Sequence, residues 1–318
     1  MLQSLLETSL QDEFVSPLKA LSEALVRAGS RYKNVVVLDA NSGKFLHTGS
    51  FGQIFPDRHF NFGNAEQNVF SAACGFTVRG KIPVVCTTAM GAMRAWEQIR
   101  NDMCVPHLNV KIVGAYAGIS NAEGGATYQA LEDIALMRAI PNMTVLCPAD
   151  GAETKKMVEA MLNDFGPVYL RLPVQALPTL HDHEYQFQIG KSSIYKSGTD
   201  VCIFTMGMML HSALGAAEML ERDGISTMVV NLSSVKPLDE NLIVECVKQA
   251  QRIVTVEDHQ ITGGLGSAVA EVLASYCPAK ILRLGMNGFG ESGKIEDLYR
   301  KYGLDGVGIY ESITNYKL

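Results

Sequence analysis

A single acidic side chain stands out in the stretch "FGNAEQNVFSAACG", residues 62–75. Apart from Glu66, this stretch holds only Gly, Asn, Gln, Ser and apolar residues, and the nearest Lys or Arg residues along the chain are Arg58 and Arg79. A carboxylate at a helix start is favoured by the helix dipole, usually by less than about 1 kcal/mol, and that alone can explain it. The functional alternative is a desolvated carboxyl group that hydrogen-bonds a ring nitrogen of a bound cofactor.

The elements around Glu66 follow from apolar periodicity. Predicted strands of a parallel sheet cover 34–40, 82–88, 109–117, 143–149 and 167–172, and predicted helices cover 17–28, 66–79, 91–104, 127–138 and 152–163. Asp150, followed three residues later by Glu153, predicts a capping box at the start of the last helix. This alternation predicts a doubly wound α/β domain.

The pattern changes after this domain. Residues 176–194 contain short polar turns and are interpreted as a linker, and a second series of strands and helices follows. We therefore predict two doubly wound α/β domains, over 1–175 and 195–318, with the linker 176–194 between them. His181 and His183 lie in the linker, where we expect a solvated turn rather than a metal site.

Composition excludes several classes of function. The net charge of −6 argues against nucleic acid or an anionic membrane as the main partner. The chain has no run of eighteen apolar residues, and its first residues lack a basic-then-apolar signal layout. Its seven cysteines form no CxxC pair, so we expect neither a disulfide framework nor a zinc site, and we predict a cytoplasmic location.

Two glycine clusters precede predicted helices. The stretch "GGLGSAVAEVL", residues 263–273, lacks the spacing of a phosphate-binding loop, so close packing of a helix on a sheet is the favoured interpretation. Gly124 and Gly125 lie at the carboxyl end of a predicted strand, where ligands bind in open α/β sheets.

Longer segments carry a family resemblance. The segment "HFNFGNAEQNVFSAACGFTVRGKIPVVCTTAMGAMRAWEQIR" and the later "YAGISNAEGGATYQALEDIALMRAIPNMTVLCPADGAETKKMV" resemble the pyrimidine-binding domain of transketolases. "VTVEDHQITGGLGSAVAEVL" and "GMNGFGESGKIEDLYRKYGLDGVGI" resemble the transketolase C-terminal domain. The likeness is greatest to the separately encoded C-terminal transketolase subunit and covers nearly the whole chain from about residue 16.

The resemblance implies a cofactor and a role for Glu66. In that family, the glutamate of this motif binds the aminopyrimidine of thiamine diphosphate. A carboxyl group bonded to the pyrimidine N1′ favours the imino tautomer, which activates the cofactor as an electron sink. The implied cofactor-binding positions are Glu66, Asn64, Thr88, Gly91 and Arg94, and Glu66 is the implied catalytic residue.

The family's Gly-Asp-Gly motif, which holds Mg²⁺ with a later Asn, does not occur in this chain. The resemblance therefore implies that a partner subunit with the diphosphate-binding domain holds the Mg²⁺. We expect a heterotetramer with this N-terminal transketolase-like subunit. Without the partner, we expect a large exposed apolar surface around residues 62–100.

Several positions depart from the family pattern. The two aromatic residues that flank the pyrimidine fall at Thr88 and Gly91, and an apolar residue becomes Asn64. The implied substrate positions, several of them altered, are Asn41, Tyr116, Glu123, Gly124, Tyr128 and His259, with His259 expected near the mouth of the site. The two arginines that clamp a sugar phosphate fall near Leu18 and Val174. We therefore expect an unphosphorylated or carrier-bound substrate, unless a partner residue or another cation such as Arg94 or Arg100 replaces them.

These features together predict one subunit of a two-component thiamine-diphosphate enzyme that transfers a two-carbon ketol or acyl unit. Two alternatives stay open. One is the beta subunit of a 2-oxo acid dehydrogenase decarboxylase component, which has the same domain order. The other is a non-catalytic scaffolding subunit.

Overall fold

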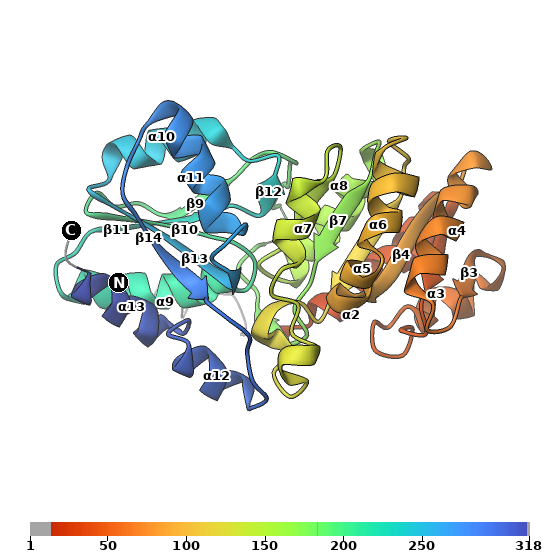
Figure 1. Ribbon diagram of the computed structural model, residues 1–318, viewed down its shortest axis with the longest axis horizontal. Helices are drawn as coiled ribbons and strands as arrows, with labels where there is room; N and C mark the ends of the chain where they lie inside the picture. Colours follow the sequence, from red (N-terminus) through yellow and green to blue (C-terminus); the bar gives the residue numbers. More distant parts are fainter. Residues whose placement is uncertain (1–13, 183, 317–318) are drawn as a thin grey trace.

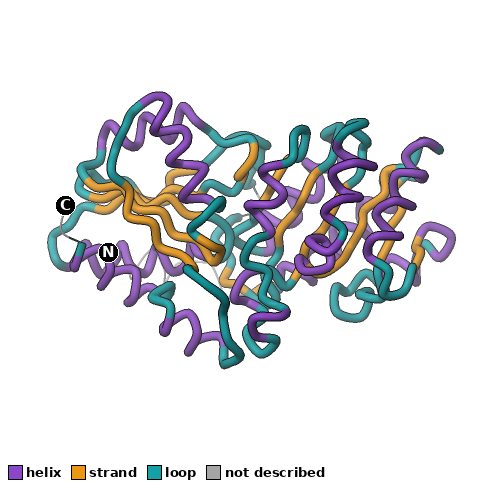
Figure 2. Tube along the Cα trace, viewed as in Figure 1, coloured by secondary structure: helices purple, strands orange, loops and turns teal. Residues whose placement is uncertain are grey.

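The computed structural model describes residues 14–182 and 184–316. Two α/β units lie side by side along the long axis of the molecule (Figure 1). The first unit holds a seven-stranded sheet and the second a five-stranded sheet, each with helices outside it (Figure 2). One apolar cluster contains buried residues of both units, among them Val85 and Phe204, so the units share a core.

The first sheet has the strand order β12-β6-β7-β5-β4-β2-β3. Its strands are β2 (Val35–Asp39), β3 (His59–Asn61), β4 (Ile82–Thr88), β5 (Lys111–Ala115), β6 (Thr144–Leu146), β7 (Val168–Arg171) and β12 (Ser234–Lys236). All pairs between β2 and β7 are parallel, which confirms the predicted parallel sheet. The central strands are buried along their whole length, as their continuous apolar runs require.

The helices of the first unit are α2 (Pro17–Arg31), α3 (Gly49–Ile54), α4 (Glu66–Val78), α5 (Ala89–Arg94), α6 (Trp96–Gln98), a π-helical turn (Ile99–Cys104), α7 (Asp133–Ala139) and α8 (Gly151–Asn163), with 3₁₀ turns at Pro56–Arg58, Gly118–Ser120 and Gly125–Thr127. The cap predicted for α8 is present, because the Asp150 carboxylate accepts a hydrogen bond from the Glu153 amide at 2.7 Å. Glu153 reaches back to the Ala149 amide at 2.7 Å. Asp150 and Glu153 thus form the reciprocal side-chain-to-backbone bonds that start α8.

The helix predicted over 127–138 begins only at Asp133. The carbonyls of Ala130 and Leu131 accept hydrogen bonds from the amides of Gly118 and Gln260, so these residues pair with distant backbone instead of turning into a helix. The helix predicted over 91–104 begins earlier, at Ala89, and is interrupted after Arg94. Tertiary hydrogen bonds explain the first difference, because they override local propensity.

The second sheet has the order β14-β13-β10-β11-β9, with only the edge strand β9 antiparallel to its neighbour. Its strands are β9 (Ser193–Lys196), β10 (Val201–Thr205), β11 (Thr227–Asn231), β13 (Arg252–Gln260) and β14 (Ile281–Met286), and its helices are α9 (Met209–Arg222), α10 (Glu240–Gln249), α11 (Leu265–Tyr276), α12 (Ile295–Lys301) and α13 (Gly306–Asn315). A separate two-stranded pair joins β1 (Phe14–Val15) to β8 (Leu177–Pro178).

A strand from the second half of the chain completes the first sheet. β12 lies antiparallel to β6, with Ser234 opposite Leu146. Next to it, the Lys236 ammonium donates to the carbonyls of Arg138 at 2.8 Å and Ile140 at 2.5 Å. The two halves are therefore tied by backbone pairing as well as by apolar contact, and the domain limits 1–175 and 195–318 stay a prediction.

The observed surface around residues 62–100 differs from the predicted one. Among the described residues of this range, the large apolar side chain left exposed is Val78, at 80%. Apart from Val78, the exposed positions of α4 are polar or small, including Gln67, Asn68 and Ser71, so the expectation of a large apolar patch there is wrong. Over residues 14–182 and 184–316, no helix has the length and apolar character that crossing a membrane demands.

Candidate active site at the carboxyl edge of the first sheet

The carboxyl ends of three neighbouring strands carry predicted site residues. Asn41 follows β2, Thr88 ends β4, and Tyr116 directly follows β5. Because β2, β4 and β5 are adjacent and parallel, these residues lie at one edge of the sheet. In open α/β sheets, ligands bind outside this edge.

Glu66 is the first residue of α4, and its side chain is 16% exposed. Because Glu66 is the first residue of the helix, its carboxylate lies at the positive end of the helix dipole. No side chain caps this helix start. The helix anchors itself behind Glu66 by burying Val69 and Phe70. A small part of the carboxyl group therefore remains open at the edge of the sheet while the helix is held by its apolar face.

Arg94 lies beside Glu66, with its Nη1 3.3 Å from the Glu66 Oε2. Glu66 is thus distant from cations along the chain but not in space, which corrects the impression of an isolated acid. The Arg94 side chain is 67% exposed, so the pair contributes little to stability.

Thr88 and Gly91 also come together with Glu66. The Thr88 hydroxyl caps α5 by accepting a hydrogen bond from the Gly91 amide at 3.0 Å. A Cβ at Gly91 would lie 3.2 Å from the Glu66 Cγ and 2.4 Å from the Thr87 Oγ1, so only glycine lets α5 approach this closely. The structure thus brings Glu66, Thr88, Gly91 and Arg94 into one cluster.

Asn64 and Asn41 lie at the rim. Asn64 is exposed in the bend before α4. Asn41 is exposed and has a φ of 60°, and its amide donates to the Asn61 Oδ1 at 3.1 Å. Both amide side chains remain accessible, and neither touches Glu66 through a hydrogen bond.

Tyr116 has an unusual backbone conformation, with a φ of 57°. Such an angle is uncommon for a non-glycine residue and concentrates at functional sites. The side chain is half-buried against the apolar cluster below the sheet, and burial raises the pKa of its hydroxyl. Tyr116 therefore stays a neutral hydrogen-bond donor at physiological pH.

Glu123, Gly124 and Tyr128 lie in the long loop between Tyr116 and α7. Glu123 is exposed, and Tyr128 is 59% exposed. A Cβ at Gly124 would lie 2.7 Å from the Tyr128 Cβ and 2.9 Å from the Asn121 Oδ1. The tight loop therefore leaves little room for a side chain at position 124.

A cleft of about 420 Å³ lies between this loop and the second unit. Tyr116 and Glu123 line it from the loop, and Val174 from the segment after β7. Lys294 and Glu296, at the start of α12, line the opposite side. The sequence interpretation did not include Lys294, because its approach to the loop depends on the packing of the two units.

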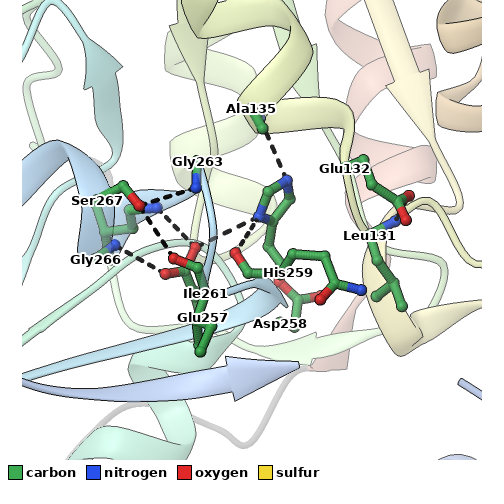
Figure 3. A network of polar contacts seen from close by, with 12 residues as sticks. Leu131, Glu132, Ala135, Glu257, Asp258, His259, Ile261, Gly263, Gly266 and Ser267 are labelled. Carbon is green, nitrogen blue, oxygen red and sulfur yellow. Dashed lines mark hydrogen bonds and ion pairs between the residues drawn. The ribbon is translucent and has the colours of Figure 1, made fainter. Parts of the chain in front are cut away.

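His259 is fully buried, so the expectation that it lies near the mouth of the site is wrong. Its Nδ1 donates to the Gln260 carbonyl at 2.8 Å, and its Nε2 accepts from the Ala135 amide at 3.3 Å (Figure 3). These two bonds define the neutral tautomer with its proton on Nδ1. His259 connects β13 to α7 and is closed off from solvent.

A buried ionic cluster beside His259 was not predicted. Arg171, at the end of β7, donates from Nη1 to the Asp258 Oδ1 at 2.7 Å and from Nε to the Asp133 Oδ2 at 3.0 Å. The Tyr169 hydroxyl donates to Asp133 at 2.8 Å, and the Tyr299 hydroxyl donates to Asp258 at 3.3 Å. All three charged side chains are at most 3% exposed, so each depends on the others for its solvation.

The glycine cluster of residues 263–273 has its backbone donors occupied. The Glu257 carboxylate accepts from the amides of Leu265 at 2.7 Å and Gly266 at 2.8 Å. A Cβ at Gly264 would lie 1.9 Å from the Glu257 Oε2. An internal carboxylate thus takes the place of a phosphate at this helix start, which confirms the packing interpretation.

The linker histidine His181 is buried and not in a solvated turn, while His183 lies outside the described residues. Its Nδ1 lies 2.8 Å from the Asp150 Oδ2, which also accepts from the amides of Leu180 and His181. Burial opposes both charges, but the bond between them raises the pKa of His181 and lowers that of Asp150. The pair anchors the linker to the start of α8.

The donor set fits one end of the cofactor that the resemblance implies. Glu66 offers a carboxyl group at the carboxyl edge of the sheet, next to the side-chain-free backbone of Gly91. In residues 14–182 and 184–316, no three His, Cys, Asp or Glu side chains are grouped so that they could hold a metal ion. The carboxyl group and the adjacent backbone are therefore groups that can hydrogen-bond an aminopyrimidine ring.

Comparison with known protein families decides the identity. Residues 15–179 match the family model of the transketolase pyrimidine-binding domain, and residues 190–309 match that of the transketolase C-terminal domain. The chain belongs to the transketolase family. The expected fold and family are thereby confirmed, and this family depends on thiamine diphosphate.

Individual relatives resemble the chain over nearly its whole length. A putative transketolase C-terminal section from Methanocaldococcus jannaschii is 45% identical over 300 residues, covering 93% of this chain and 94% of that protein. A 6-deoxy-6-sulfo-D-fructose transketolase subunit from Clostridium sp. is 36% identical, covering 89% and 88%. A solved structure described as a split gene transketolase, inactive β4 tetramer, has a TM-score of 0.88 at 41% identity, covering 94% and 97%.

Proposed function

We propose that this chain is one subunit of a two-component enzyme that transfers a two-carbon ketol or acyl unit with thiamine diphosphate. The observation that carries the proposal is the position of Glu66 at the carboxyl edge of the first sheet, beside the backbone of Gly91. The family membership supports ketol transfer over the decarboxylating alternative. The substrate is a small molecule or is presented by a carrier.

Thiamine diphosphate, when bound, supplies a carbon nucleophile and an electron sink for bonds next to a carbonyl. Glu66 would exchange a proton with the pyrimidine N1′, and Thr88, Gly91, Arg94 and Asn64 would form the surface around that ring. The hydroxyls of Tyr116 and Tyr128 donate hydrogen bonds to a substrate carbonyl or alkoxide. A tyrosine is a poorer proton shuttle than a histidine near pH 7, so these hydroxyls orient and polarise the substrate.

The Mg²⁺ and the diphosphate are held by a partner chain with the N-terminal transketolase-like domain, in a heterotetramer. Two observations support this assembly. The chain has no Gly-Asp-Gly motif. A similar chain from a split gene forms an inactive β4 tetramer, as its description states.

Co-expression with the N-terminal subunit tests the proposal. We expect the purified complex to bind thiamine diphosphate with Mg²⁺ and to transfer a ketol unit in a donor screen, whereas this chain alone does neither. Tight cofactor binding and turnover by the isolated chain would contradict the two-component assignment. A complex that assembles but does not bind the cofactor would establish the scaffolding alternative.

A further inference from the structure

We propose that Asn61 is a positioning residue for Glu66 and acts through the turn that leads into α4. The inference rests on the proposed function, because it concerns the carboxyl group assigned there to the cofactor. Asn61 is the last residue of β3, and Glu66 is the first residue of α4. Asn61 was not among the site positions that the sequence indicated.

One side-chain oxygen of Asn61 joins two loops. Its Oδ1 accepts hydrogen bonds from the Gly63 amide at 2.8 Å and from the Asn41 amide at 3.1 Å. Gly63 lies in the turn before α4, and Asn41 lies in the loop after β2. An amide oxygen has two lone pairs, so it can accept both bonds at once. The Asn61 side chain therefore ties the turn before Glu66 to the carboxyl edge of the first sheet.

The two residues that donate to Asn61 both have left-handed backbones. The φ angle is 69° at Gly63 and 60° at Asn41. Glycine adopts this conformation freely, whereas other residues adopt it only where neighbouring groups stabilise it. The Asn61 oxygen supplies an acceptor for the amide of each turn. Its removal should therefore loosen both turns together.

The turn transmits this restraint to the start of α4. The Gly63 carbonyl accepts a hydrogen bond from the Ala65 amide at 2.7 Å. Ala65 directly precedes Glu66, and its own carbonyl accepts from the Val69 amide at 3.0 Å. A continuous series of hydrogen bonds thus runs from the Asn61 side chain into the first turn of α4. Because no side chain caps this helix, its start depends on the turn.

The start of α4 determines how Glu66 meets α5. The Glu66 Oε2 lies 3.3 Å from the Arg94 Nη1, and a Cβ at Gly91 would lie 3.2 Å from the Glu66 Cγ. A displacement of the helix start by about 1 Å would alter both contacts, and shifts of that size can slow a reaction strongly. Asn61 itself is exposed, so water can replace its two bonds at little cost to the fold. We therefore expect its loss to change the geometry of Glu66 more than the stability of the chain.

The test uses the assembled complex and the exchange of the C2 proton of bound thiamine diphosphate, followed by NMR. Asn61→Ala should slow this exchange about tenfold. Asn61→Asp should keep it within about threefold of wild type, because a carboxylate oxygen can accept the same two bonds. Asn163→Ala is the matched control, since the Asn163 Oδ1 accepts a bond from the Tyr32 hydroxyl at 2.8 Å at the end of α8. The control should leave the exchange rate unchanged.

A Glu66→Gln background separates positioning from an independent effect. If Asn61 acts through Glu66, then Asn61→Ala should slow the exchange no further in the Glu66→Gln complex. The same slowing in both backgrounds would overturn the inference. Equal rates in Asn61→Ala and Asn61→Asp, or equal slowing by Asn163→Ala, would also overturn it.

A measurement without cofactor distinguishes failure of this inference from failure of the proposed function. In the cofactor-free complex, the Gly63 and Asn41 amides of Asn61→Ala should exchange hydrogen about tenfold faster than in wild type, and Asn61→Asp should restore their protection. If the complex does not bind the cofactor, the proposed function fails and these amides still decide. Unchanged protection overturns the role of Asn61, and a selective increase in exchange at the two amides supports it.

Discussion

Arg171 and Asp258 join the two halves of the molecule through a hydrogen-bonded ion pair of 2.7 Å. Arg171 ends β7 of the first sheet, and Asp258 lies in β13 of the second. Both side chains are at most 3% exposed, and Arg171 also neutralises Asp133. The contact is therefore a buried charge cluster at the boundary between the units, where removal of one member leaves the others without compensation.

Arg171→Met should lower the free energy of unfolding by about 3–5 kcal/mol, since two buried carboxylates lose their cation. Urea denaturation followed by circular dichroism measures the effect. Arg31→Met is the control, because Arg31 pairs with Glu159 on the surface and should cost less than about 1 kcal/mol. Equal losses in the two variants would show that the cluster is not a structural tie.

The His181–Asp150 pair predicts a pH-dependent contribution to stability. The pKa of His181 is raised in the folded chain, so its stabilisation is complete below about pH 6.5 and is lost as the pH rises through the folded pKa. The pKa of Asp150 is lowered, so its contribution is present above about pH 4 and is lost on further acidification. His181→Gln should therefore destabilise the chain more at pH 6 than at pH 8.5. A destabilisation that is independent of pH over this range would exclude the charged pair.

Glu66→Gln should lower the rate of ketol transfer by the complex about 10²–10⁴-fold and leave the fold intact. The glutamine amide keeps the shape of the side chain but cannot share a proton with the pyrimidine N1′. Exchange of the C2 proton of bound thiamine diphosphate, followed by NMR, reports this role directly. Glu123→Gln is the control with the same change of charge, and it should leave the exchange rate unaffected. An unchanged rate in Glu66→Gln would refute the assignment.

Two glycine substitutions should have opposite effects. Gly264→Ala places a methyl group on the Glu257 carboxylate and should destabilise the chain by about 1–3 kcal/mol. Gly75→Ala lies inside α4 with open space around the new methyl group, and it should stabilise the chain by about 0.5–1 kcal/mol. Thermal melting compares the two. A neutral Gly264→Ala would mean that α11 does not pack closely on β13.

Much of the fold was predictable from local patterns. Continuous apolar runs such as that of β2 identify buried parallel strands, because both of their faces are covered. Asp150 and Glu153 identified the start of α8, since a capping box is a local contact of residues three apart. The motif around Glu66 and the longer segments indicated the family, because ordered motifs of that length are far more specific than a short glycine pattern.

Only the tertiary structure placed residues that are distant in sequence. Arg94 lies beside Glu66, β12 joins the first sheet, His259 is buried, and Lys294 faces the loop after Tyr116. The irregular segment before α7 also depends on the tertiary structure, because its carbonyls accept hydrogen bonds from amides elsewhere in the chain. Apolar periodicity reports how one element meets the core, whereas each of these contacts depends on how two elements pack against each other. For that reason the sequence by itself determined the strands, the cap and the motif that contains Glu66, and the packing of the two units decided which charges surround the candidate site.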